Sequence, residues 1–258
     1  MTSQRAAPHD TPLGLLGYSP QAARALREVG LLAVSLPAEN LVGVLEASQA
    51  LRFCGALVAP ALGAGVLALS RPDLSARRAG GADALSFAGG VQATHTLADA
   101  LQDALESSGY PVRGARALLI GQAGDLSAGL ALARLGLGSL TLAASSQPEA
   151  ERLARDLPAG LKLHLTSRGD PALSTLAERA DLLVLTAGSL PPGLLHPYHA
   201  LLDLTGRSAL AAGRAGASLV PLEELAGLRL ARQLLHATGQ RFRPEALGEL
   251  MAVLDKGH

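Results

Sequence analysis

The sequence contains very few residues of several types, and each scarcity excludes a class of protein. Cys54 is the only cysteine among 258 residues, which excludes an intramolecular disulfide framework and a thiolate metal cluster. In its apolar surroundings this cysteine is expected to be a small buried hydrophobic side chain. Aromatic residues account for 2% of the chain, so leucine, alanine and valine must fill the core, and the hydrophobic content of 48% is ample for that.

Long apolar runs and a charge excess are also missing. No run of about 20 apolar residues occurs, so no segment is expected to span a membrane. Residues 1–11 are polar and lack the apolar core of a signal peptide. The 22 basic and 22 acidic residues give a net charge of zero, so there is no excess of positive charge that would indicate binding to nucleic acid or to an anionic membrane. We therefore expect a cytoplasmic monomer or homodimer whose partner is a small-molecule ligand.

Lysine and asparagine are scarcer than the average composition would suggest. The only lysines are Lys162 and Lys256, and the only asparagine is Asn40. A residue type that is absent cannot supply its chemistry. Lysine-based acid–base catalysis is therefore excluded for the first 161 residues of the chain.

Two series of alternating strand and helix patterns follow one another along the chain. Residues 13–94 read as strand, helix, strand, helix and strand, and then as a hairpin. From 115 to 214, strands alternate with amphipathic helices, which predicts a parallel sheet with helices on both faces. A helix over 97–108 links the two series. The expected fold is α/β with two domains, residues 12–98 and residues 99–239.

The second series opens with a strand, a glycine turn and a helix, which is the order found at the entry to a dinucleotide-binding unit. Of the three glycines of G-x-G-x-x-G, only the first is present, as Gly121. Ala123 and Leu126 stand at the second and third positions, with Gly124 and Gly129 nearby. We interpret the stretch as the start of a Rossmann-like nucleotide-binding domain. A plain strand-to-helix turn is the alternative.

Several strings resemble motifs of the shikimate dehydrogenase family, over about residues 13–255. Residues 90–105 are similar to the family's G-x-N-T-D-x-x-G-F-x-x-A-L and match it at Thr96 and at two later positions. Residues 55–60 are similar to G-x-N-V-T-x-P-x-K, and residues 181–187 to D-L-L-V-N-A-T.

The resemblance implies a fold and an activity. The fold has an N-terminal substrate domain, a C-terminal NADP-binding domain of the Rossmann type, and a last helix, here 240–256, that returns to the first domain. The activity is oxidation of shikimate, or reduction of 3-dehydroshikimate, by hydride transfer in aromatic amino acid biosynthesis.

The residues that carry the family's chemistry are replaced in this chain. The lysine proton donor falls near Leu62, and no lysine precedes Lys162. The paired aspartate is Leu97, and a substrate-binding asparagine is His95. Reduction of a carbonyl needs a proton donor beside the oxygen that receives the proton. We therefore assign no catalytic residue and expect little or no oxidation of shikimate.

Three candidate substrate-binding residues remain, Ser19, His95 and Thr96. Ser19 lies in a string similar to a shortened S-x-S-P loop and also suits the N-cap of a helix. His95 is close to the lost aspartate and titrates in the range of acid–base work, with Asp83 or Asp99 as a partner. A local helix cap is the alternative for His95.

One histidine pair has the spacing of metal ligands. His196 and His199 are three residues apart, but no acidic or cysteine ligand is adjacent to them. We interpret them as a loop pair and expect no metal site.

The candidate cofactor site begins with residues 121–125, which resemble the family's G-A-G-G-A turn. The next strand ends in Ala144, Ser145 and Ser146, where the family has N-R-T, whose arginine holds the 2′-phosphate of NADP. The acidic residue of an NAD enzyme is absent there too. The two serines either bond a ribose or phosphate or cap the next helix, and NADP and NAD stay open. The candidate cofactor-binding residues are Gly121, Gln122, Ala123, Gly124, Asp125, Leu126, Ser145, Ser146 and Thr186.

Three functions are consistent with these observations. The first is a shikimate dehydrogenase-like oxidoreductase that is weak or inactive on shikimate. The second is a non-catalytic pseudoenzyme, in which the same fold serves as a binding or interaction module. The third is an oxidoreductase that acts on a different, more apolar substrate.

Overall fold

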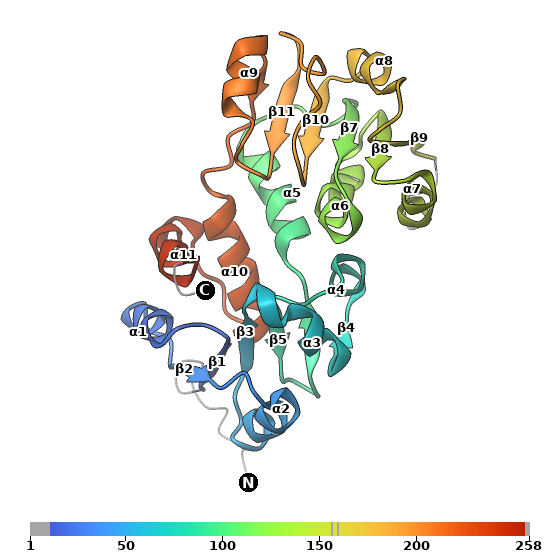
Figure 1. Ribbon diagram of the computed structural model, residues 1–258. Coiled ribbons are helices and arrows are strands. Elements are labelled where there is room, and N and C mark those ends of the chain that lie inside the picture. Colours follow the sequence, from blue (N-terminus) through green and yellow to red (C-terminus); the bar gives the residue numbers. More distant parts are fainter. Residues whose placement is uncertain (1–10, 156, 159, 256–258) are drawn as a thin grey trace. The chain divides into compact units, whose positions relative to one another are not determined.

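The computed structural model describes residues 11–155, 157–158 and 160–255 (Figure 1). Apart from Thr11, the predicted polar N-terminal segment lies outside the described residues, as does residue 256 of the predicted last helix. The chain forms two compact units. The first unit is Met1–Ala100 with Glu224–His258, and the second unit is Leu101–Glu223.

The first unit contains a mixed six-stranded sheet in the order β2-β1-β3-β5-β6-β4. Strand β1 runs parallel to β2 and β3, whereas β5 runs antiparallel to β3 and β6, so the predicted hairpin is present. The strands are β1 (Leu13–Leu16), β2 (Ala33–Leu36), β3 (Gly55–Val58), β4 (Arg71–Pro72), β5 (Ala84–Ser86) and β6 (Gln92–Thr94). The helices are α1 (Pro20–Glu28), α2 (Leu41–Ala50), α3 (Gly63–Ala68), α4 (Leu74–Ala79), α10 (Leu225–Thr238) and α11 (Gly248–Asp255), with 3-10 turns at Pro60–Leu62 and Pro244–Ala246.

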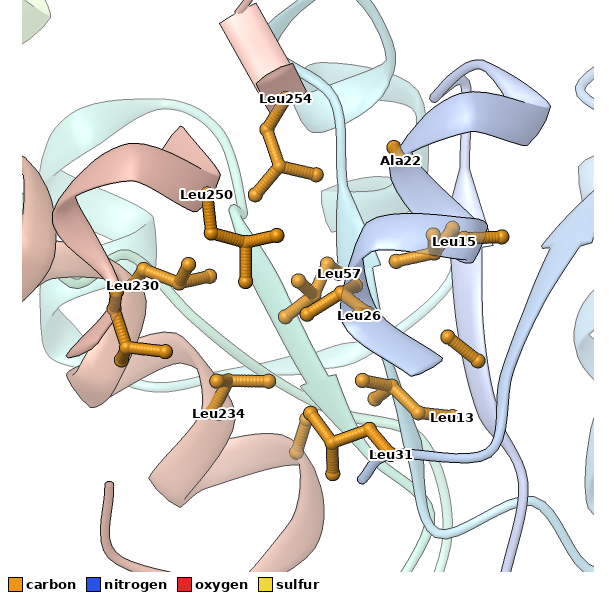
Figure 2. Close-up of a cluster of buried hydrophobic side chains, with 14 residues drawn as sticks. Leu13, Leu15, Ala22, Leu26, Leu31, Leu57, Leu230, Leu234, Leu250 and Leu254 are labelled. Atoms are coloured by element: carbon orange, nitrogen blue, oxygen red, sulfur yellow. The ribbon is translucent and has the colours of Figure 1, made fainter. Parts of the chain in front are cut away.

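One core cluster of the first unit joins the two ends of the chain (Figure 2). Leu13 and Leu57 come from the sheet, Leu26 comes from α1, and Leu230 and Leu234 come from α10. Burial of a leucine side chain contributes about 1.5–3 kcal/mol, so this cluster fastens the C-terminal helices to the sheet. The solitary cysteine, expected to be buried, is half-buried beside the cluster.

Helix α10 lies against the sheet of the first unit, on β3 and β5. A Cβ atom on Gly55 of β3 would lie 2.4 Å from the carbonyl oxygen of Ala237 of α10, so only glycine permits this approach. The compact units therefore divide the chain at Glu224, whereas the sequence analysis placed the boundary after residue 239. An amphipathic pattern shows which face of a helix is buried but not which sheet covers it.

The second unit contains a parallel six-stranded sheet in the order β12-β11-β10-β7-β8-β9. Helix α5 (Leu97–Ser107) leads into it from the first unit. The strands are β7 (Arg116–Ile120), β8 (Ser139–Ala144), β9 (Lys162–Ser167), β10 (Leu182–Leu185), β11 (Ala200–Asp203) and β12 (Ser218–Leu219). The helices are α6 (Ala123–Leu130), α7 (Gln147–Ala154), α8 (Leu173–Glu178) and α9 (Ala209–Ala215), with a 3-10 turn at Ala131–Leu135.

The central strands of this sheet, β7 and β10, are continuous apolar runs and are almost wholly buried, as expected where helices cover both faces. The order of the strands is that of a doubly wound Rossmann sheet, and the predicted two-domain α/β fold is confirmed. From β7 the chain moves to β8 on one side and later returns to β10 on the other. Ligands of such sheets bind at the carboxyl ends of the strands, next to this change of direction.

None of the helices in the described part of the chain is long and apolar enough to cross a membrane.

Candidate functional site

The turn after β7 is tightly packed. The backbone N–H of Gly121 donates to the carbonyl of Ala143, at 3.2 Å. A Cβ atom on Gly121 would lie 2.0 Å from Oγ1 of Thr186 and 2.8 Å from the side chain of Leu126, so the turn requires glycine. The Leu126 side chain is fully buried. Of the predicted cofactor residues, Leu126 can therefore contribute only its backbone.

Gly129 accounts for the missing third glycine of the motif. A Cβ atom at this position would lie 2.3 Å from Cδ1 of Leu119 on β7. Close packing of the first helix on the first strand is the role of the third glycine in dinucleotide-binding turns. Leu126 occupies the sequence position of that glycine, and Gly129 performs its packing role.

The N-terminus of α6 follows this turn. Its N-cap residue, Gln122, has an extended backbone and makes no capping hydrogen bond with its side chain. The first backbone N–H groups of a helix have no partner within the helix, and they attract anions. Asp125 lies in the first turn, where neighbouring atoms partly desolvate its carboxyl group and raise the pKa of that group. The side chain of Ala123 lies outside the described part of the structure.

The end of β8 is not free of acidic groups, which corrects the sequence analysis. Ser145 and Ser146 are exposed, and the backbone N–H of Ser145 donates to Oε2 of Glu149 at 3.0 Å. Glu149 lies in the first turn of α7, which carries its carboxylate back to the strand end. The S-x-x-E pattern of Ser146 and Glu149 is typical of a capping box, in which the glutamate turns back to the start of the helix; here it bonds the N–H of Ser145, one residue earlier, and Ser146 makes no side-chain cap.

Arg168 follows β9 and also lies at the carboxyl ends of the strands. Its backbone N–H donates to the carbonyl of Ala144 at 2.8 Å, and its Nη2 donates to the carbonyl of Ser189 at 3.1 Å. The half-buried guanidinium covers Gly188, where a Cβ atom would lie 2.7 Å from Nη2. Arg168 is not among the residues predicted from the sequence, because no motif marks it. The available signal was its position three residues after the predicted strand 161–165; the observed strand, β9, extends to Ser167.

Thr186 completes this group of residues. Its backbone N–H donates to the carbonyl of Ile120 at 2.9 Å, and its hydroxyl contacts the same carbonyl at 3.4 Å. The carboxyl ends of β7, β8, β9 and β10 therefore carry the glycine turn, the two serines, Glu149, Arg168 and Thr186. Donors, a cation and a tight turn at one end of a parallel sheet suit a nucleotide.

The histidine pair lies at the opposite ends of the strands. Nδ1 of His199 accepts a hydrogen bond from the backbone N–H of His196, and Nε2 of His199 contacts the carbonyl of Ala177, each at 3.0 Å. This buried ring also borders a cavity of about 440 Å³ with Asp181 and Tyr198. Among the described residues, no group of three or more His, Cys, Asp and Glu side chains is arranged to hold a metal ion.

In the first unit, the predicted substrate residue Thr96 belongs to a buried polar cluster. Its backbone N–H and its hydroxyl each donate to the Asp83 carboxylate, at 2.9 Å. Nε and Nη2 of Arg229, on α10, donate to the same carboxylate at 3.1 Å. This buried carboxylate is thereby neutralised and fully bonded. No local sequence pattern pairs Arg229 with Asp83, because 146 residues separate them.

His95 lies next to this cluster and is half-buried. Burial lowers the pKa of its ring, and the charge of Arg229 adds to that effect, whereas Asp83 and Asp73 oppose it. The ring is therefore neutral at pH 7 and is able to accept a proton. Asp73 itself is held by the hydroxyl of Thr94 at 2.6 Å and by the backbone N–H that it caps on α4.

Ser19 is the N-cap of α1, and its Oγ accepts a hydrogen bond from the backbone N–H of Ala22 at 3.4 Å. Leu62, near which the resemblance places the lysine, ends a 3-10 turn and packs against the apolar cluster that contains Val58 and Leu85. A Cβ atom on Gly17 would lie 2.8 Å from Cδ1 of Leu62. The environment of Leu62 is therefore apolar and closely packed.

No protein-family model matches the sequence, and no curated protein matches it. Solved structures do match over nearly the whole chain. Shikimate 5-dehydrogenase from Thermus thermophilus, in complex with NADP(H) and shikimate, has 23% identity and a TM-score of 0.69, covering 94% of this chain and 98% of that one. Quinate dehydrogenase from Corynebacterium glutamicum, in complex with NAD, has 18% identity and a TM-score of 0.74, covering 95% and 99%.

A third match has yet another activity. The ligand-free 5-ketofructose reductase of a Gluconobacter strain has 14% identity and a TM-score of 0.70, covering 94% of this chain and 97% of that one. The chain thus has the fold of the shikimate dehydrogenases, a fold shared by enzymes with different substrates and with either nicotinamide cofactor.

Proposed function

We propose that the second unit binds a nicotinamide dinucleotide and that the protein does not oxidise shikimate at the rate of an ordinary dehydrogenase. The binding proposal is supported by the carboxyl ends of β7 to β10, where a glycine-dependent turn, an N-terminus of α6 without a side-chain cap, and Arg168 occur together. When bound there, the cofactor would supply or accept a hydride. A small-molecule ligand and a cytoplasmic monomer or homodimer belong to the same proposal.

One observation carries the second half of this proposal. The carboxylate next to the candidate substrate residues, that of Asp83, is neutralised by Arg229 and by two bonds from Thr96. Its hydrogen-bonding capacity is therefore committed to Arg229 and Thr96. By the resemblance, the donor and its partner are Leu62 and Leu97, which carry no proton to exchange. The polar hydroxyls of shikimate would also face apolar side chains, at about 1–3 kcal/mol for each unpaired group.

Two measurements test this proposal. Thermal denaturation of the full chain with NADP, with NAD and with neither shows whether the nucleotide binds, since a ligand at 100 times its Kd adds about 2.7 kcal/mol of stability. The absorbance of the reduced nicotinamide, followed with shikimate and each cofactor, then shows whether shikimate is oxidised. Absence of any nucleotide effect, or turnover at a rate of about 1 per second or more, contradicts the corresponding half of the proposal.

A second candidate function is oxidation of a different, more apolar alcohol, with His95 as the proton acceptor. The observation in its favour is the neutral ring of His95, whose pKa is lowered by burial, next to Asp83 and Asp73. A neutral imidazole suits removal of a proton from an alcohol. If a screen of apolar alcohols finds activity, His95→Gln is expected to lower kcat at least about 100-fold. Unchanged kcat in that variant would exclude the role.

A further inference from the structure

Arg168 is a cation without an ionic partner among the described residues. By contrast, Arg229 forms an ion pair with Asp83, at 3.1 Å, and Arg116 forms one with Asp181, at 2.6 Å. Arg168 instead donates to a backbone carbonyl, that of Ser189. A half-buried guanidinium has five N–H donors and a full positive charge. One carbonyl accepts from only one of these donors and balances only a small part of the charge.

The nearest acidic residue along the chain does not neutralise Arg168. Asp170 is two residues away, but its two carboxylate oxygens are held by the hydroxyl of Thr166, at 2.5 Å, and by the backbone N–H of Ala172, at 2.8 Å. These bonds direct the Asp170 carboxylate to its own turn. They lower the pKa of that carboxyl group, which keeps it ionised and in place.

The position of Arg168 matches a specific requirement of nucleotide recognition. Its backbone is bonded to Ala144, at the end of β8, and its guanidinium reaches the loop after β10. In doubly wound sheets the adenosine ribose lies at the end of the second strand, which is β8 here, and an arginine nearby accommodates the 2′-phosphate of NADP. The residues that follow β8, Ser145 and Ser146, carry hydroxyls but no cation.

We propose that Arg168, reaching in from β9, is the residue that binds the 2′-phosphate of NADP, so that the second unit prefers NADP to NAD. This inference rests on the proposed binding of a dinucleotide by the same unit. A guanidinium offers two parallel N–H donors to a phosphate, and the resulting charge-assisted bonds are about twice as strong as neutral ones. Ser145 and Ser146 are exposed and follow Ala144, to whose carbonyl the backbone of Arg168 is bonded, and their hydroxyls can bond the remaining phosphate oxygens.

Glu149 acts against this preference. Its carboxylate lies at the end of β8, 3.0 Å from the N–H of Ser145, and a carboxylate there favours the ribose hydroxyls of NAD. Its charge is partly offset by that N–H and by the N-terminal end of α7, whereas the guanidinium of Arg168 meets one backbone carbonyl among the described residues. The cation therefore dominates. Glu149→Gln is expected to strengthen binding of the 2′-phosphate further.

The test is titration calorimetry of the full chain with two probes, 2′,5′-ADP and 5′-AMP, which differ by the 2′-phosphate. The wild-type chain is expected to bind 2′,5′-ADP at least about tenfold more tightly. Arg168→Ala is expected to abolish that ratio and to leave binding of 5′-AMP within about twofold, and Arg168→Lys to retain part of it. Arg152→Ala, on the exposed face of α7, is the matched control and is expected to keep the wild-type ratio.

The outcomes separate this inference from the function on which it rests. If the wild-type chain binds neither probe, the proposed nucleotide binding fails, and the role of Arg168 fails with it. If the chain binds both probes equally, or if Arg168→Ala keeps the wild-type ratio, nucleotide binding stands and the inference is overturned. Because Arg168→Lys keeps the charge and the packing, it tests the same ratio if the alanine variant does not fold.

Discussion

Each unit of this protein holds a partly buried arginine, and the two arginines differ in what surrounds them. In the first unit, Arg229 donates twice to Asp83, whose carboxylate is also bonded twice by Thr96. In the second unit, the guanidinium of Arg168 has one hydrogen-bond partner among the described residues, the carbonyl of Ser189. A cation that is paired with a carboxylate within the fold contributes to the stability of the fold. A cation that is not neutralised has binding capacity left for an anion.

The comparison extends to the surroundings of the two residues. The carboxylate of Asp83 is occupied by Arg229 and Thr96, and Leu62, at the position of the family's lysine, is packed among apolar residues. The strand ends at Arg168 combine a glycine turn with exposed serines. In the first unit, the charges of Asp83 and Arg229 thus stabilise the fold, whereas the strand ends of the second unit keep the features of a binding site.

The largest expected effect comes from breaking the pair in the first unit. Asp83→Leu leaves Arg229 without its partner and is expected to lower the free energy of unfolding by about 3 kcal/mol, because it strands a buried charge. Urea denaturation measures the change. The matched control is the double variant with Arg229→Leu, which removes both charges and is expected to lose less. A double variant that is less stable than Asp83→Leu would contradict the structural role of the pair.

The glycine turn of the second unit provides the next prediction. Gly121→Ala introduces a Cβ atom 2.0 Å from Thr186 and is expected to cost about 2 kcal/mol of stability. Gly213→Ala is a control in the same unit, since nothing lies within 4 Å of its Cβ position in α9, and it is expected to stabilise the chain by about 0.5–1 kcal/mol. Equal effects of the two substitutions in thermal denaturation would show that the turn is not closely packed.

Acid is expected to destabilise the protein through one partly or fully buried histidine in each unit. Burial lowers the pKa values of His95 and His199 below their ordinary value of 6.5. As the pH falls through about 6.5, the unfolded chain binds protons that the folded chain does not bind, so the free energy of unfolding decreases. Urea denaturation between about pH 8 and pH 5 measures the slope. His199→Gln should reduce it, and an unchanged slope would remove His199 from this explanation.

The smallest expected change in stability is that caused by removing Arg168, and it distinguishes Arg168 from Arg229. Arg168→Ala is expected to change the free energy of unfolding by no more than about 0.5 kcal/mol, because the native fold gives this cation a single carbonyl partner. Arg229→Ala, its counterpart, is expected to cost about 2 kcal/mol or more, since it leaves the Asp83 carboxylate buried and unpaired. Urea denaturation of both variants decides the matter. Equal losses would make Arg168 a structural residue too.

The sequence predicted the architecture because the architecture depends on local periodicity. The alternating pattern of the second series indicated a parallel sheet, and the structure confirms it from β7 to β11. The short strand β12 had no pattern to reveal it, since it has only two residues. The assignment of α10 to the first unit depended on its packing against β3 and β5, a contact that no local pattern encodes.

By itself, the amino-acid sequence determined the two-unit α/β architecture and the glycine turn after β7. It also determined that residues 1–100, the N-terminal part of the first unit, contain no lysine. Only the tertiary structure decided which charges meet. Asp83 and Arg229 are 146 residues apart, and Glu149 and Arg168 reach the same strand ends from different elements. Burial patterns repeat every two to four residues and can be read locally, whereas the partner of a charge is set by how distant segments pack.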